Sequence, residues 1–173
     1  MPLREMDIES VVVGSGPVAS LVVLKSHPDT EGTTFELPIR IGNIEASAIS
    51  MGIQKNGNTR PMTHDLLASV IDSLGGRLRS VRVISVEGTT FFAQLELVGA
   101  NGVVSFVDAR PSDAIALAVR VHAPIYAEET VLNTASMPNF RGVESAERKE
   151  ELQRFHEFVE TISPEDFSNT TEE

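Results

Sequence analysis

The chain of 173 residues contains no cysteine, no tryptophan and a single tyrosine. Without cysteine it can form no disulfide and no Cys-ligated metal site, and it has no thiol nucleophile. The few aromatic side chains leave little material for stacking on single-stranded nucleic acid, although eight phenylalanines remain. Walker, G-x-S-x-G and H-E-x-x-H motifs are also missing, so the sequence carries no familiar nucleotide, hydrolase or zinc signature.

Basic residues are outnumbered, with 14 Lys and Arg against 25 Asp and Glu, and the net charge is −11. This balance argues against a protein that coats nucleic acid through bulk electrostatics. The acidity is uneven, because residues 144–173 hold ten acids and three bases. The preceding part of the chain can therefore still carry a local positive site.

Long hydrophobic runs are absent as well. The mostly apolar stretch Val18–Leu24, which contains one serine, is far shorter than the roughly 20 residues that span a bilayer. The N-terminus has acids and no apolar stretch of signal-peptide length. We therefore expect a cytoplasmic protein that does not bind membranes.

The patterning predicts an α+β fold: a mixed, mainly antiparallel sheet packed with about three core helices, plus a C-terminal amphipathic helix. Pro38 places its strand near a sheet edge. Expected strands are 8–13, 18–24, 35–39, 78–86, 91–97, 103–108 and the short 123–126; expected helices are 43–54, 63–74, 113–121 and 146–162. Expected parts are a main domain over 1–134, a linker over 135–143, a helical extension over 144–167 and a disordered tail over 168–173.

Glu45 stands out in the helix expected at 43–54. It falls inside an apolar arc that includes Ile44, Ala48, Ile49, Met51 and Ile53. A carboxylate in that position is costly unless it is paired, bound to metal or turned toward a cleft.

One local pattern occurs twice: an Arg-Pro step, then a hydroxyl residue, then an acid in the first turn of a helix. The two copies are Arg60-Pro61-Met62-Thr63-His64-Asp65 and Arg110-Pro111-Ser112-Asp113. Helix N-termini attract anions, and arginine adds a rigid fork of donors, so Arg60, Thr63, Arg110 and Ser112 are predicted phosphate contacts. The alternative is ordinary helix capping, which uses the same hydroxyl and acidic residues.

Several groups suited to hydrolytic chemistry lie near these helix starts. The candidate catalytic residues are His64, Asp65, Asp108, Asp113 and Glu45. Carboxylates at a strand end and a helix start suit Mg²⁺ or Mn²⁺, so Asp108, Asp113 and Glu45 are the predicted ligands, with no organic cofactor. His64 could be a ligand, a general base or a phosphate contact. The alternatives are ion pairs of Asp108 or Glu45 with Arg110 or Arg60, and a partly exposed structural histidine.

Four motifs in unbroken order, within about residues 6–134, carry a resemblance to a known family. They are Leu37-Pro38-Ile39-x-Ile41-Gly42-x-x-Glu45-Ala46-x-Ala48-Ile49, Arg60-Pro61-x-Thr63-His64-Asp65-Leu66-Leu67, Asp108-Ala109-Arg110-Pro111-Ser112-Asp113-Ala114-Ile115-Ala116-Leu117-Ala118-x-Arg120 and Ala123-Pro124-Ile125-Tyr126. In these residues the chain resembles the bifunctional nuclease domain family. The short helical motif of excision-repair nuclease subunits, which some relatives append, is not evident.

The resemblance implies a mixed α/β domain that self-associates as a homodimer or larger homo-oligomer, with DNA and RNA as substrates. What the resemblance implies about functional residues applies to the motif positions of this sequence, which are Glu45, Arg60, His64, Asp65, Asp108, Arg110, Ser112 and Asp113. The leading hypothesis is a nuclease that hydrolyses phosphodiester bonds with help from a divalent metal. The alternative is a non-enzymatic oligomeric module that binds a small phosphorylated ligand or a protein partner.

Overall fold

The computed structural model describes residues 2–14, 19–29, 32–54 and 60–137. Its strands are β1 (Leu3–Val12), β2 (Ser20–Ser26), β3 (Glu36–Ile41), β4 (Arg77–Glu87), β5 (Thr90–Val98), β6 (Val104–Ala109) and β7 (Ile125–Glu128). Its helices are α1 (Asn43–Gln54), α2 (Thr63–Ser73), α3 (Pro111–Val121) and α4 (Glu129–Ala135). The predicted helix at 146–162 and the tail at 168–173 lie outside the described residues, as does most of the predicted linker.

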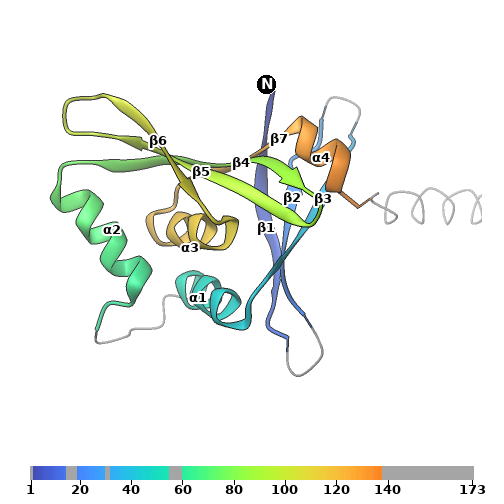
Figure 1. The fold of residues 1–173 in the computed structure, drawn as a ribbon, viewed down its shortest axis with the longest axis horizontal. Helices are drawn as coiled ribbons and strands as arrows, with labels where there is room; N and C mark the ends of the chain where they lie inside the picture. The colour runs from blue at the N-terminus through green and yellow to red at the C-terminus, as the bar shows by residue number, and fades with distance from the viewer. Residues whose placement is uncertain (1, 15–18, 30–31, 55–59, 138–173) are drawn as a thin grey trace, which may run out of the picture. The chain divides into compact units, whose positions relative to one another are not determined.

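The described strands form one sheet in the order β3-β2-β1-β7-β4-β5-β6 (Figure 1). Neighbouring strands run antiparallel, except that β4 and β7 pair in parallel through Val81↔Ile125 and Val83↔Ala127. The late strand β7 thus joins an N-terminal set of three strands to a second set of three. A mixed, mainly antiparallel sheet with helices confirms the predicted α+β class.

The two edges of the sheet are β3 and β6. Pro38 lies in β3, opposite Val23 of β2, so its expected position at an edge is confirmed. An edge tolerates proline because the missing N–H can face away from the neighbouring strand.

Helix α3 lies at the centre of the helical layer and packs against both α1 and α2 (Figure 1). Seven of its eleven residues are buried, among them Ile115 and Leu117 at 0% exposure. Its alanines let neighbouring backbones approach closely, while the two longer side chains fill the core under β4 and β5. Helix α3 is therefore the buried centre of the helical layer.

The apolar arc expected on α1 is wrong in part. Ile44 is 83% exposed, and Met51 and Ile53 are exposed too, whereas Ala46, Ala48 and Ile49 are buried. The buried side of the helix is formed by Ala46, Ala48 and Ile49, so the larger residues of the arc face outward. Helix α2 begins at the predicted residue and ends one residue before the predicted end. It buries no residue, because it lies at the end of the layer, against α3 and β4.

Helix α4 was not expected from the sequence. It packs against β3, β4 and β7 through the buried side chains of Val131 and Leu132. Within the described ranges, no helix combines the length and the apolar character needed to cross a membrane. The cytoplasmic location stays a prediction.

Candidate active site at the start of helix α3

Arg110 is the residue around which the candidate site is built. It is the N-cap of α3, with extended backbone angles (φ −66°, ψ 141°), and Pro111 begins the helix after it. Proline suits this position because it has the helical φ and needs no N–H partner there. The sequence therefore holds the guanidinium at the point where β6 has ended and the central helix begins.

The Arg110 guanidinium joins two acids from different parts of the chain. Its Nε donates to Oδ2 of Asp113 at 2.8 Å, and its Nη2 lies 3.3 Å from Oδ1 of the same residue. Its Nη1 donates to Oε1 of Glu45 in the first turn of α1 at 3.0 Å. Glu45 is thus paired with an arginine, one of the alternatives left open by the sequence.

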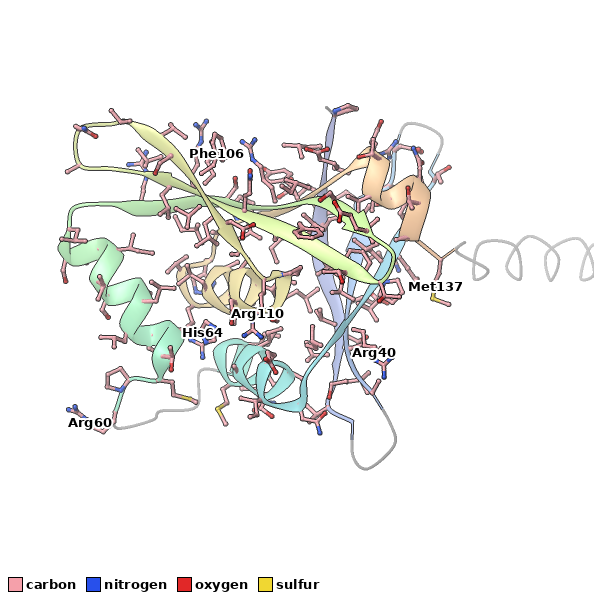
Figure 2. All side chains as sticks on the ribbon, in the orientation of Figure 1. Arg40, Arg60, His64, Phe106, Arg110 and Met137 are labelled. Atoms are coloured by element: carbon pink, nitrogen blue, oxygen red, sulfur yellow. The ribbon has the colours of Figure 1, made fainter. Side chains whose placement is uncertain are left out.

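His64 brings the start of α2 to the same place. Its Nε2 lies 3.2 Å from Oδ1 of Asp113, and its side chain is 15% exposed. Figure 2 shows His64 and Arg110 close together between the helices, whereas Arg60 points away into solvent. The structure therefore gathers Glu45, His64, Arg110 and Asp113 from the first turns or caps of three helices.

The pKa values of Asp113 and Arg110 depend on each other and on their neighbours. Partial burial raises the pKa of the Asp113 carboxyl, but hydrogen bonds from Arg110 and His64 outweigh it, and the net pKa lies below the ordinary 3.8. The hydrogen bond and charge of Asp113, followed by those of Glu45, raise the pKa of Arg110. Asp113 is therefore ionised, and Arg110 cationic, at neutral pH.

Asp65 does not join this group but fixes the helix that carries His64. Its Oδ2 accepts from the backbone N–H of Met62 at 2.8 Å, and its Oδ1 accepts from Nε of Arg120 at 2.5 Å. The Met62 N–H, and then Arg120, lower the pKa of Asp65 below its ordinary value. Met62 is the N-cap of α2, and Thr63 is the first residue of the helix.

Arg120 is the residue that sequence reasoning missed. Its side chain is only 7% exposed, and Nη1 donates to the backbone oxygens of Ala48 at 3.0 Å and Ala116 at 2.7 Å. It thereby connects α1, α2 and α3. The available signal was a single arginine directly after the apolar run Ala114–Val119, because a buried arginine requires partners.

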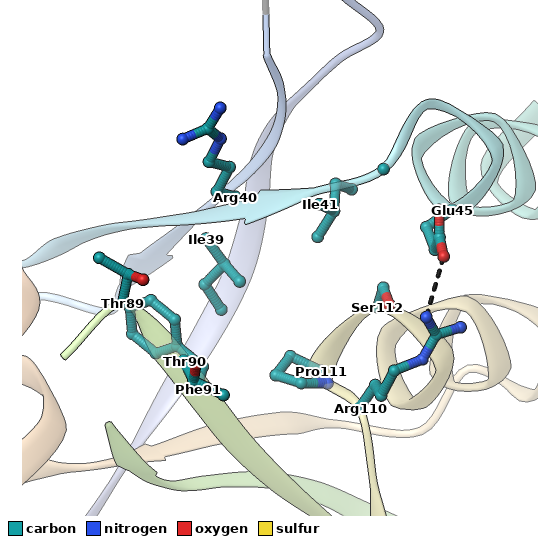
Figure 3. A pocket seen from close by; sticks show the side chains of 11 residues that line it. Ile39, Arg40, Ile41, Glu45, Thr89, Thr90, Phe91, Arg110, Pro111 and Ser112 are labelled. Carbon is teal, nitrogen blue, oxygen red and sulfur yellow. Dashed lines mark hydrogen bonds and ion pairs between the residues drawn. The ribbon is translucent and has the colours of Figure 1, made fainter. Parts of the chain in front are cut away.

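A pocket of about 430 Å³ lies beside the Arg110–Glu45 pair (Figure 3). Its walls come from the end of β3, the start of α1, the β4–β5 turn and the start of α3. Figure 3 shows Arg110 reaching toward Glu45, while Arg40 points away from Arg110. Ser112, one of the predicted phosphate contacts, also lines the pocket, and its residue is 6% exposed.

Besides Asp65, three further predicted site residues lie outside both this group and the pocket. Arg60 is exposed and has no ion pair or hydrogen bond with another described residue. Thr63 is the first residue of α2 and makes no hydrogen bond within the described ranges through its hydroxyl. Asp108 is exposed on β6, opposite Gln94.

The three carboxylates predicted as metal ligands are likewise not gathered together. Within the part of the chain that the structure describes, no group of three or more His, Asp or Glu is placed to hold a metal ion. Glu45 and Asp113 face the same arginine, whereas Asp108 lies on the exposed strand. Because Mg²⁺ often takes one or two protein carboxylates and several waters, Mg²⁺ or Mn²⁺ assistance stays a prediction.

Comparison with known proteins places these residues within a recognised domain. The family model for the bifunctional nuclease domain matches residues 22–139, a range that includes all four gathered side chains. The uncharacterized protein Rv1829 of Mycobacterium tuberculosis is 43% identical over 138 residues, which cover 78% of this chain and 82% of that protein.

Two plant proteins are more distant relatives. Bifunctional nuclease 1 of Arabidopsis thaliana is 36% identical over 107 residues, and bifunctional nuclease 2 is 32% identical over 108 residues. The matches cover 60% and 61% of this chain but 32% of each plant protein. Because the family match spans well over half of its 173 residues, the chain belongs to the bifunctional nuclease domain family.

Proposed function

We propose that this chain hydrolyses phosphodiester bonds of DNA and RNA at the group formed by Glu45, His64, Arg110 and Asp113. The observation that carries the proposal is the continuous contact from His64 through Asp113 to Arg110, which sets a base, a carboxylate and a phosphate-binding cation side by side. The adjacent pocket gives the substrate room to approach Arg110.

Arg110 is suited to hold the phosphate. A guanidinium has five N–H donors, and the bonds to Asp113 and Glu45 use three of them. Two N–H groups are left on Nη1 and Nη2, and the side chain is 66% exposed. The two carboxylates fix the plane of the guanidinium, so its free edge is oriented before substrate arrives.

His64 is suited to activate water. When Nε2 carries the ring proton and donates it to Asp113, Nδ1 is left as an acceptor. In the proposed step Nδ1 takes a proton from water, the oxygen attacks phosphorus, and the leaving oxygen departs with the bond electrons and is protonated by solvent. A bound Mg²⁺ or Mn²⁺ would neutralise phosphate charge, and Glu45 and Asp113 are the residues that would hold it.

The test is degradation of plasmid DNA and of RNA by identically purified variants, in EDTA and with Mg²⁺ or Mn²⁺. We expect His64→Ala and Asp113→Asn to lose activity. Asp72→Asn, an exposed change on the same helix as His64, should retain it. Equal degradation by all preparations would identify a contaminant and end the proposal.

The pocket supports a second candidate, a binding module for a small phosphorylated ligand. Its volume of about 430 Å³ lies within the ordinary range for small-molecule sites, and Arg110 and Ser112 offer donors. Thermal-shift measurements with mononucleotides and sugar phosphates separate the two candidates. Stabilisation that disappears in Arg110→Ala, without any cleavage of nucleic acid, would favour the binding module.

A further inference from the structure

The pocket beside Arg110 has two unlike ends. Four of its lining side chains are apolar: Ile39, Ile41, Phe91 and Pro111. Figure 3 shows Ile39 and Phe91 at one end of the pocket and Arg110 at the other. The proposed hydrolysis uses only the end at Arg110, so the apolar end has no role in it. An apolar wall beside a cation is typical of a site whose ligand has both an apolar and an anionic part.

Phe91 presents its ring to the pocket because of its place on β5. Side chains alternate along a strand, so Phe91 shares a face with Ala93, which is fully buried in the core, and Phe92 points to the opposite face. Phe91 itself lies near the start of the strand and is half-buried. Its ring is thus packed against the core on one side and lines the pocket on the other.

The pocket also has two hydroxyl groups on the side of Phe91. Thr89 and Thr90 lie where β4 turns into β5, and both are exposed and line the pocket. Each hydroxyl can donate one hydrogen bond and accept others. A nucleobase matches this arrangement, because its flat faces stack on an aromatic ring and its polar atoms lie along its edge. A sugar ring carries hydroxyls on most sides and would gain little from an apolar wall.

We propose that the apolar end of this pocket is a nucleobase subsite, in which the base next to the phosphate held by Arg110 stacks on Phe91. The inference rests on the proposed function, because it takes Arg110 as the phosphate contact. A base inside a duplex is covered on both faces by its neighbours and paired along its edge, so it cannot enter such a pocket. The subsite therefore selects single-stranded nucleic acid, or a base that has been turned out of the stack.

The first test compares ligands that share a phosphate and differ in the base. Adenosine monophosphate and ribose phosphate are titrated into the full chain in EDTA, and calorimetry gives the two dissociation constants. We expect wild type to bind the nucleotide at least about fivefold more tightly, which is the lower end of what stacking of a base on an aromatic ring contributes. Equal affinity for the two ligands, or no binding of either, would overturn the proposal.

Phe91→Leu removes the ring, and Phe92→Leu is the matched control, because it makes the same change one residue later on the opposite face of β5. Phe91→Leu should weaken nucleotide binding about fivefold or more and leave binding of ribose phosphate unchanged. Phe92→Leu should change neither. Circular dichroism checks that the variants are folded, and Phe91→Met, which fills more of the space of the ring, replaces a leucine variant that does not fold. Equal effects at the two positions would contradict stacking on Phe91.

A cleavage assay separates this proposal from the proposed hydrolysis. A labelled single strand with one base-free sugar at a defined position keeps every phosphate, and the same strand with all its bases is the control. We expect cleavage beside the base-free sugar to fall about fivefold or more. Equal cleavage of the two strands at that position would remove the subsite and leave the nuclease. Nucleotide binding that depends on Phe91, without cleavage of any strand, would leave the subsite and remove the nuclease.

Discussion

His64 and Asp113 lie 49 residues apart in the chain, yet Nε2 of the first is 3.2 Å from Oδ1 of the second. The contact joins the first turn of α2 to the first turn of α3, the two helix starts that share the Arg-Pro pattern. The two copies of the pattern thus contribute side chains to one group, and the proposed hydrolysis depends on this contact.

Replacing His64 with glutamine should abolish most nuclease activity while leaving the fold intact. Glutamine can still donate a hydrogen bond to Asp113 but cannot take a proton from water. We expect kcat to fall by about 10²-fold or more, the usual contribution of a general base. Initial rates on a labelled oligonucleotide measure this, and an unchanged pH–rate profile in the variant would contradict the role.

Replacing Arg110 with lysine should weaken substrate binding. The ammonium keeps the charge but cannot bridge Asp113 and Glu45 in a fixed plane while offering a free edge to phosphate. We expect KM to rise by about tenfold, with a smaller change in kcat. Steady-state kinetics at several salt concentrations measure both constants, and a lysine variant with wild-type KM would exclude the phosphate contact.

Replacing Arg120 with methionine should destabilise the domain by about 2–4 kcal/mol, because it removes the hydrogen bonds of the guanidinium to Asp65 and to two backbone carbonyls. Urea unfolding measures the loss. The matched control is Arg60→Met, an exposed arginine without an ion pair to any described residue, which should cost less than about 0.5 kcal/mol. Similar losses in the two variants would mean that Arg120 does not lock the helices together.

The buried carboxyl of Glu96 predicts acid sensitivity. Hydrogen bonds from Ser80, and then from Arg82, lower its pKa below the ordinary 4.5. A group with a lower pKa in the folded state stabilises the fold above its unfolded pKa, and this stabilisation is lost as pH falls. The free energy of unfolding of wild type should therefore decline below about pH 4.5.

The same measurement in Glu96→Gln provides the comparison. The variant should be less stable than wild type at neutral pH, by about 1–3 kcal/mol, and its stability should change less between neutral and acidic pH. Asp65 and Asp113 have lowered pKa values too, so part of the acid dependence remains. Parallel curves for variant and wild type would contradict the assignment to Glu96.

His122 ends α3 in the left-handed conformation, with φ at 56°. A side chain at such a position costs energy that glycine avoids, although glycine also gains freedom in the unfolded chain. We expect His122→Gly to stabilise the fold by up to about 1 kcal/mol. Thermal melting measures this, with His122→Ala as the control that retains the strain.

Local signals in the sequence predicted the elements well. The run Ala114–Val119 is apolar, which is typical of a buried helix, and Gly75-Gly76 is a typical helix end, where Gly75 has φ at 73°. Pro38 indicated an edge strand. Each of these follows from the conformational limits of a few adjacent residues.

Long-range relationships could not be obtained in the same way. The sequence indicated that Glu45 is an unusual carboxylate, and it left both Arg110 and Arg60 as possible ion-pair partners. The choice between them depends on how α1 packs against α3. The solvent-facing side of α1 was misjudged because Ile44 is apolar, although the buried side is formed by Ala46, Ala48 and Ile49. The parallel pairing of β7 with β4 also has no local signature.

Strand β7 is the last of the described strands along the chain, yet it occupies the middle of the sheet between β1 and β4. During synthesis on a ribosome the strands β1–β3 and β4–β6 emerge first, as two separate sets. The sheet can be completed only after Glu128 has left the exit tunnel. Nascent chains stopped before Ile125 would expose the backbone edges of β1 and β4, which makes this stage of translation the one at which a chaperone would be needed.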